Sequence, residues 1–237
     1  MRPVNETVTD IEIIEDFSST ARCDEGFLRI RRLRCQNRRA DGSASPIYRV
    51  DVVDRPRLDA VAVLIYRRGA SGELEVLTRK NLRPAAYFRR GKEMVVPDPV
   101  SYLLVEELVA GVMELEDKGE AGVRRRAVEE VCEEAGYEVA PEEIRMLGGG
   151  FFVAPGIISE KVFPTAVDVT GKQARPPQGD GSPLEEGTEL QWRPIHALLA
   201  ACRRGEVPDA KLEIAITRLL AEQAQGTVRV GPGEGNG

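Results

Sequence analysis

The sequence is poor in aromatic residues and in histidine, and both shortages limit what the chain can do. Aromatic residues account for 5% of the 237 residues, so aliphatic side chains are expected to dominate the core. His196 is the single histidine. A catalytic pair of Ser or Cys with His is therefore excluded unless His196 itself serves, and a histidine-based zinc site is not expected.

Cysteines and long apolar runs are also scarce. The four cysteines stand at positions 23, 35, 132 and 202 and form no CxxC pair, which predicts free thiols rather than a zinc finger or a disulfide framework. The start of the chain lacks the apolar segment of a signal peptide. No apolar run approaches the ~20 residues that span a bilayer. We therefore expect a cytoplasmic protein with no membrane segment.

Acidic residues outnumber basic ones. The net charge is -6, from 33 basic and 39 acidic residues. Because nucleic-acid-binding surfaces carry basic patches, this balance argues against nucleic acid as a partner. The basic run 124–126 is interpreted as solvated surface.

The region before residue 58 contains short strand-like segments. Residues 27–33 alternate apolar and polar side chains, and Asp41-Gly42 is a turn signal before the next segment. The expected strands are 11–14, 27–33 and 47–52. Residues 1–57 are therefore predicted to form a β-rich extension.

Residues 58–225 mix strand and helix patterns, which predicts an α+β domain. The continuous apolar run 60–66 is typical of a strand buried on both faces. Its expected hairpin partner is 74–79. Further strands are expected at 103–109, 151–153, 162–169 and 190–192, and helices after Gly119, at 195–204 and at 209–223. Residues 84–98 are expected to be a loop, and the glycine-rich tail 226–237 to be flexible.

Three carboxylates stand at helical spacing in the first predicted helix. Glu130, Glu133 and Glu134 are related as i, i+3 and i+4, so they share one helix face. Gly136 follows at a position that ends a helix. Like charges on one face repel by roughly a few tenths of a kcal/mol per pair, and a divalent cation would remove this conflict. Such oxygen ligands suit Mg²⁺ or Mn²⁺; a solvated acidic helix face is the alternative interpretation.

The stretch that ends at Tyr137 resembles the Nudix box. The family pattern is Gly, five residues, Glu, seven residues, then Arg-Glu-apolar-x-Glu-Glu-x-Gly-apolar. Its second half matches Glu130 to Tyr137. The first half departs from the pattern, because three extra residues separate Gly111 from Glu120 and one extra residue follows Glu120.

A second departure is Glu129, which stands where the family has Arg. In the family that Arg usually pairs with the first Glu of the motif. Here Arg125 or Arg126, one helical turn back, could neutralise Glu129 instead. The role of Glu120 stays open between an indirect metal contact and a favourable interaction with the helix dipole.

Segments outside the box resemble the ADP-ribose and UDP-sugar pyrophosphatase branch of the family, in the same order over about residues 45–222. They are Asn81-Leu82-Arg83-Pro84-Ala85, Val109-Ala110-Gly111, Ala154-Pro155-Gly156-Ile157-Ile158-Ser159-Glu160, Glu185-Glu186-Gly187 followed by Trp192, and Gly205-Glu206-Val207-Pro208-Asp209-Ala210-Lys211. The resemblance implies the Nudix fold, an α/β/α sandwich with a mixed central sheet. It also implies that the N-terminal antiparallel β extension makes a homodimer.

The resemblance also implies roles for individual residues. Mg²⁺, or Mn²⁺, is expected to be bound by Glu130, Glu133, Glu134 and the backbone carbonyl of Ala110. The catalytic residues are expected to be Glu133, Glu134 and the loop residue Glu160. Glu160 or a helix carboxylate would take a proton from the attacking water. The substrate is expected to contact Arg83, whose guanidinium can grip phosphate oxygens, together with Ala110 and Gly111.

The expected function is metal-dependent hydrolysis of the diphosphate of ADP-ribose or a related nucleoside diphosphate sugar, giving a nucleoside monophosphate and a sugar phosphate. One alternative is a diphosphatase that prefers UDP-glucose or GDP-mannose; the long segment 84–98, which resembles that of the UDP-sugar diphosphatases, makes UDP-glucose a close rival. Another is a Nudix-fold regulator that binds nucleotide sugars without cleaving them, which Glu129 favours. The preferred base stays open, with Phe27, Tyr66 and Tyr87 as candidates for stacking on it.

Overall fold

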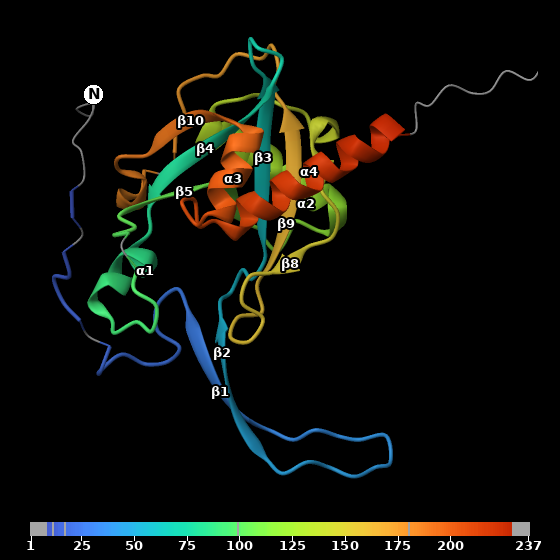
Figure 1. Cartoon of the computed structure of the whole chain (residues 1–237). Coiled ribbons are helices and arrows are strands. Elements are labelled where there is room, and N and C mark those ends of the chain that lie inside the picture. Colours follow the sequence, from blue (N-terminus) through green and yellow to red (C-terminus); the bar gives the residue numbers. More distant parts are fainter. Residues whose placement is uncertain (1–8, 11, 17, 99, 180, 229–237) are drawn as a thin grey trace, which may run out of the picture.

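The structure is a computed structural model that describes residues 9–10, 12–16, 18–98, 100–179 and 181–228 (Figure 1). It has one mixed sheet with helices on both faces and a separate antiparallel hairpin. The α+β class, the mixed sheet and the antiparallel N-terminal strands are therefore confirmed.

The central sheet is built around the apolar run that begins at Ala60. Its strands are β3 (Ala60–Arg68), β4 (Leu74–Leu82), β5 (Leu104–Glu107), β6 (Val109–Val112), β7 (Arg145–Met146), β8 (Phe151–Phe152), β9 (Lys161–Asp168) and β10 (Glu189–Pro194). They follow the order β10-β4-β3-β9-β7, with β5 on β4, β6 on β3 and β8 on β9. β3 runs antiparallel to β4 and β6 but parallel to β9, which makes the sheet mixed.

Side chains of β3 alternate between two apolar clusters, one on each face of the sheet. The long helices are α2 (Gly119–Ala135), α3 (Ile195–Arg203) and α4 (Ala210–Val228). Ala62 and Leu64 pack with α3 and α4, whereas Val61 and Val63 pack with α2. Because successive strand residues point to opposite faces, helices on both sides account for the uninterrupted apolar run.

The N-terminal hairpin extends away from the sheet (Figure 1). Its strands are β1 (Arg29–Cys35) and β2 (Tyr48–Asp54), paired antiparallel along their whole length. One contact with the rest of the chain is made by Val53, whose N–H donates to the carbonyl of Ile157 at 2.7 Å. The strand expected at 11–14 is wrong, since residues 12–14 form no strand; position 11 lies outside the described residues.

Three other predicted elements differ in detail. The strand expected at 103–109 is two strands, β5 and β6, which leave Leu108 between them and pair with different partners. The segment expected to be a loop at 84–98 contains a short helix, α1 (Pro84–Tyr87), and a 3₁₀ turn at Phe88–Gly91. Helix α4 continues past the expected end to Val228, and positions 229–237 of the predicted tail lie outside the described residues.

The expected free thiols are confirmed, because all four cysteines are unpaired in the structure. Cys23 and Cys132 are exposed, whereas Cys202 of α3 is buried in the apolar cluster that α3 and α4 share. In the part of the chain that the structure describes, no helix is both long enough and apolar enough to cross a membrane.

Candidate functional site

The three carboxylates of α2 line one cavity. Glu130 is buried, Glu134 is partly buried and Glu133 is exposed. Together with Ala110 and Gly111 they line a cavity of about 230 Å³. The structure thus brings together the three helix carboxylates and the two residues of the Val-Ala-Gly segment that the sequence analysis singled out.

Strand β6 supplies the floor beneath these carboxylates. The backbone N–H of Ala110 donates to Oε2 of Glu134 at 3.4 Å. A Cβ on Gly111 would lie 1.7 Å from Oε1 of Glu130, so only glycine allows the Glu130 carboxylate to lie this close to the strand. The glycine at this position therefore has a packing reason.

The end of α2 fixes the position of the carboxylates. Gly136 caps the helix with a φ of 74°, and a Cβ there would meet the carbonyl oxygen of Arg175 at 1.9 Å. The last turn of a helix leaves carbonyls without partners inside the helix. The N–H groups of Gln178 and Gly179 bind the carbonyl of Glu133, both at 3.2 Å. The segment 175–179 is thereby fixed to the carboxylate-bearing end of α2.

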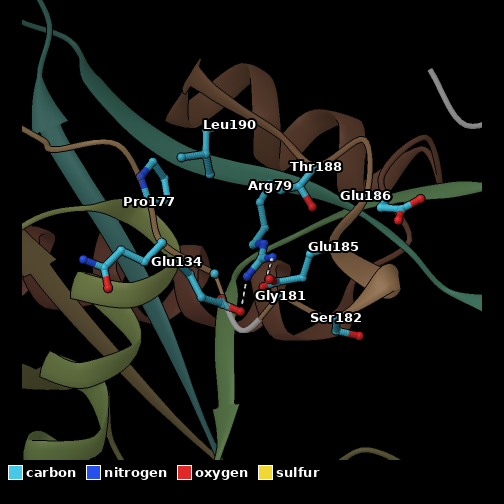
Figure 2. Close-up of a pocket in the computed structure, with 11 residues that line it drawn as sticks. Arg79, Glu134, Pro177, Gly181, Ser182, Glu185, Glu186, Thr188 and Leu190 are labelled. Carbon is cyan, nitrogen blue, oxygen red and sulfur yellow. Dashed lines mark hydrogen bonds and ion pairs between the residues drawn. The ribbon is translucent and has the colours of Figure 1, made fainter. Parts of the chain in front are cut away.

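A buried arginine, Arg79 of β4, lies between two acidic side chains (Figure 2). Its Nη1 forms an ion pair with Oε1 of Glu134, and its Nη2 lies 3.2 Å from Oε1 of Glu185. Its Nε donates to Oδ1 of Asn81 at 3.1 Å. The Arg79 side chain is 4% exposed. Leu77, Arg79 and Asn81 alternate along β4, so all three point to the face that α2 covers.

A larger cleft of about 470 Å³ adjoins the carboxylate cavity, since Glu134, Gly179 and Glu185 line both. Arg79 lies in its wall, and residues from 177–179 and 181–188 supply most of the rest of the lining. Several of these are polar: Ser182, Glu186 and Thr188, which Figure 2 shows, and Gln178. Hydroxyl, amide and carboxylate groups of this kind can form hydrogen bonds with a polar organic ligand.

Crowding and burial alter the acidity of these groups. Burial, followed by the neighbouring charges of Glu134 and Glu133, raises the pKa of Glu130 to about 7. Burial also raises the pKa of Glu134, and this effect outweighs the opposing influence of Arg79. Burial lowers the pKa of the Arg79 guanidinium, but Glu134 and Glu185 outweigh it and leave the pKa raised.

The donor chemistry of the cavity fits a hard divalent cation. All the side-chain donors are carboxylate oxygens, which Mg²⁺ and Mn²⁺ prefer. In the described part of the chain, however, no three His, Cys, Asp or Glu side chains converge as a metal-ligand group. One reason is visible in the geometry, because Glu134 is turned towards Arg79.

Arg83, the expected substrate-binding arginine, lies outside both cavities. Its guanidinium forms an ion pair with the buried carboxylate of Glu107, which also accepts from Nδ2 of Asn81 at 2.7 Å. Because Asn81 in turn accepts from Arg79, a continuous hydrogen-bond network links Arg83 to the α2 carboxylates. Nearly half of the Arg83 side chain remains exposed.

Glu160 is also placed apart from the α2 carboxylates. Its Oε2 lies 2.8 Å from Nη2 of Arg55, in an ion pair with side chains 21% and 8% exposed. It lines neither cavity. The acidic loop residue that does reach Glu134 and Arg79 is Glu185, from the 3₁₀ turn Pro183–Glu185.

Glu120 and Glu129 have partners of their own. Glu120 binds Arg124 one turn along α2 and lines a separate cavity of about 630 Å³ at the start of the helix. Glu129 is 2.8 Å from Nη1 of Arg126, as the sequence allowed. The other candidate, Arg125, binds Asp117 instead.

Sequence reasoning did not single out Arg79 or Asp117. Arg79 is a cation within a mostly apolar strand, in line with Leu77, which is a signal that a charged group is buried. Asp117 follows Gly111 by the five residues that the Nudix pattern places between its Gly and first Glu. Its side chain is 1% exposed and binds Arg126 through Nε at 3.1 Å. A buried acid just before α2 is therefore paired with Arg126 in the middle of that helix.

Comparison with known proteins adds no relative to this description. Neither the protein-family models nor the curated proteins include a match to the chain.

Proposed function

We infer that the chain is a Nudix-type hydrolase that cleaves the diphosphate of ADP-ribose or a related nucleoside diphosphate sugar, with Mg²⁺ or Mn²⁺ as cofactor. One observation carries this proposal: Glu130, Glu133, Glu134, Ala110 and Gly111 line a single cavity. The sequence resemblance named these residues separately, and they come from two elements of the fold. If the acidic face of α2 were only solvated surface, Glu130 would not be expected to be buried against Gly111 of β6.

The proposal assigns metal-binding and proton-accepting roles to the residues of the cavity. When bound, the cation would neutralise charge on the diphosphate and make an attacking water more acidic. Glu130, Glu133 and Glu134 would hold it, with the Ala110 carbonyl as a further oxygen. Glu133 is exposed, and no described cation pairs with it, so it can accept a proton from water.

The adjoining cleft gives the rest of the substrate a place. Its polar wall, formed by residues from 177–179 and 181–188, suits the hydroxyl-rich sugar half of a nucleotide sugar. ADP-ribose, UDP-glucose and GDP-mannose all carry such a hydroxyl-rich sugar. An activity assay therefore has to decide which of them is preferred.

A second candidate function is a regulator that binds nucleotide sugars without cleaving them. The observation that favours it is the ion pair of Glu134 with buried Arg79, which supplies the carboxylates with a cation of the protein's own. In that case the chain would bind nucleotide sugars with or without a divalent cation and turn none of them over.

We also propose a homodimer formed through the N-terminal hairpin. Five large apolar residues there are exposed: Phe27, Leu28, Ile30, Ile47 and Tyr48. Phe27, Leu28 and Ile30 lie at one end of the hairpin and Ile47 and Tyr48 at the other, so a partner that covers the length of the hairpin would bury both groups. Sedimentation velocity of the full chain measures this directly. A monomer at all concentrations would contradict the proposal.

The deciding experiment measures phosphate release from ADP-ribose, UDP-glucose and GDP-mannose with Mg²⁺ and a coupled phosphatase, for the wild type and Glu134→Gln. Glu189→Gln, on the exposed side of β10, is a matched control that leaves the cavity intact. Turnover that the Glu134 variant loses and the Glu189 variant keeps would support the hydrolase. Calorimetric binding of these compounds without turnover of any would support the regulator instead.

A further inference from the structure

The acidic side chains around Arg79 outnumber the single positive charge that this arginine supplies. Glu130, Glu133, Glu134 and Glu185 line the 230 Å³ cavity, and Arg79 is the guanidinium that reaches into this group. A buried cation is costly unless it is well paired. Arg79 meets that condition through two carboxylates and one amide oxygen, but the carboxylates retain an excess of negative charge.

Arg79 also occupies an oxygen of Glu134 that a metal ion would need. Its Nη1 pairs with Oε1 of Glu134, while Oε2 of the same carboxylate accepts from the Ala110 N–H. Both oxygens are therefore engaged within the protein. Each oxygen keeps a second lone pair, but the positive guanidinium beside Oε1 repels a divalent cation, so the two compete for Glu134.

The guanidinium has a second possible partner beside it. Arg79 lines the 470 Å³ cleft as well as contacting the carboxylates, as Figure 2 shows. The planar fork of an arginine matches the oxygens of a phosphate group as well as those of a carboxylate. Nε remains anchored to Asn81, so Nη1 can change partners without removal of the side chain from its buried position.

We propose that Arg79 is an exchangeable counter-ion, which binds Glu134 when the cavity holds no metal ion and binds a phosphate oxygen of the substrate once a divalent cation takes Glu134. This rests on the proposed diphosphate chemistry of the site. Arg79 and the cation compete for Glu134, yet both bind the diphosphate. Arg79 therefore weakens metal binding to the free protein and strengthens binding of the substrate in the presence of metal.

The two effects have opposite signs, which makes the proposal testable. Arg79→Met removes the competitor and leaves a side chain of similar length. We expect Mn²⁺, titrated alone and followed by its electron paramagnetic resonance signal, to bind roughly fivefold or more tightly than to the wild type. Binding of ADP-ribose in the presence of saturating Mg²⁺, measured by calorimetry, should weaken by at least a similar factor.

Two further variants complete the experiment. Lys80→Met is the matched control, because Lys80 is the next residue of β4 and pairs with Glu189 outside both cavities; neither affinity should change. Arg79→Lys keeps the positive charge but loses the planar guanidinium. Because the buried charge is kept, this variant should fold even if Arg79→Met does not. For the Lys variant we expect Mn²⁺ affinity equal to or above that of the wild type, together with weaker ADP-ribose binding.

Each result has a defined meaning. Mn²⁺ affinity that falls in folded Arg79→Met or Arg79→Lys would show that Arg79 merely positions Glu134, and would overturn the proposal. Mn²⁺ affinity that is unchanged in both variants would also overturn the proposal. If the wild type binds Mn²⁺ in this way but neither binds nor hydrolyses any nucleotide sugar, the exchange with metal stands and the proposed function fails.

Discussion

Gly111 and Glu130 are in direct contact, so that a Cβ at position 111 would overlap the Glu130 carboxylate, 1.7 Å from its Oε1. Gly111 belongs to a paired strand, so the Glu130 carboxylate, at the end of a flexible side chain, is the group that would have to move. The contact fixes how near the carboxylate comes to the strand.

Gly111→Ala is therefore expected to displace Glu130 and to weaken Mn²⁺ binding and turnover by about tenfold or more. A misplacement of about 1 Å at a reacting centre can cost up to roughly 100-fold in rate, so a loss of this size is within reach of the substitution. Gly91→Ala is the control, because a Cβ there would meet nothing within 4 Å. Metal titration and steady-state kinetics of both variants measure the effect. Equal behaviour of the two alanine variants would show that Glu130 does not bind the metal.

The raised pKa of Glu130 predicts a pH-dependent stability of the metal-free protein. The folded chain holds the Glu130 proton up to about pH 7, whereas the unfolded chain releases it near the ordinary pKa of 4.5. The stabilising effect is thus present below pH 4.5 and is lost as pH rises through 7. A shift of this size corresponds to at most roughly 3 kcal/mol.

Urea unfolding in EDTA at pH 4.5 and pH 8 measures this loss, with Glu130→Gln as the reference. The wild type is expected to lose stability relative to the Gln variant between the two pH values. Addition of Mg²⁺ at pH 8 should reduce the difference, because a bound cation favours the ionised carboxylate. Parallel behaviour of wild type and variant in EDTA would contradict the raised pKa.

An arginine at position 129, where the Nudix pattern has one, is expected to destabilise this chain. Glu129 pairs with Arg126 at 2.8 Å, and Arg126 also binds buried Asp117. Glu129→Arg would exchange that pair for repulsion one turn from Arg125 and Arg126, with a loss of roughly 0.5–1 kcal/mol. Thermal unfolding is the measurement, and Glu129→Gln, which loses the pair without adding charge, should lie between the two. Higher stability or kcat/KM in Glu129→Arg would show that the box needs its arginine here too.

Local patterns predicted the carboxylate helix well. The spacing of Glu130, Glu133 and Glu134 and the terminating Gly136 depend only on helix geometry, and the structure places them as expected. The buried strand β3 was recognisable for a similar reason, since its apolar run matches burial on both faces. The sequence carried enough information wherever neighbours along the chain decide the structure.

The partners of these groups depend on contacts between distant segments, and the sequence did not reveal them. Arg79, Glu134 and Glu185 come from a strand, a helix and a loop, and they meet only because β10 pairs with β4 and carries the preceding loop across α2. Similarly, the short loop before β9 brings Glu160 to Arg55 rather than to α2. The periodicity of residues along the chain does not predict contacts between such distant segments.

Glu160 offers a direct comparison between the role that the resemblance implies and the role that the structure suggests. Arg55 holds the Glu160 carboxylate at 2.8 Å and also donates to the carbonyl of Leu58 at 2.8 Å. The pair therefore joins the loop before β9 to the segment that follows the hairpin. A group held in this way acts first as a structural link.

Glu160→Gln and Arg55→Met are expected to lower the melting temperature by similar amounts, and the double variant by less than their sum, because the two residues share one interaction. Both single variants should lower kcat only slightly, and by similar factors. A general base contributes roughly 10²–10⁴-fold. If Glu160→Gln alone lowers kcat by 100-fold or more while Arg55→Met does not, Glu160 takes the proton from water, and the loop must move from Arg55 to the carboxylate cavity during turnover.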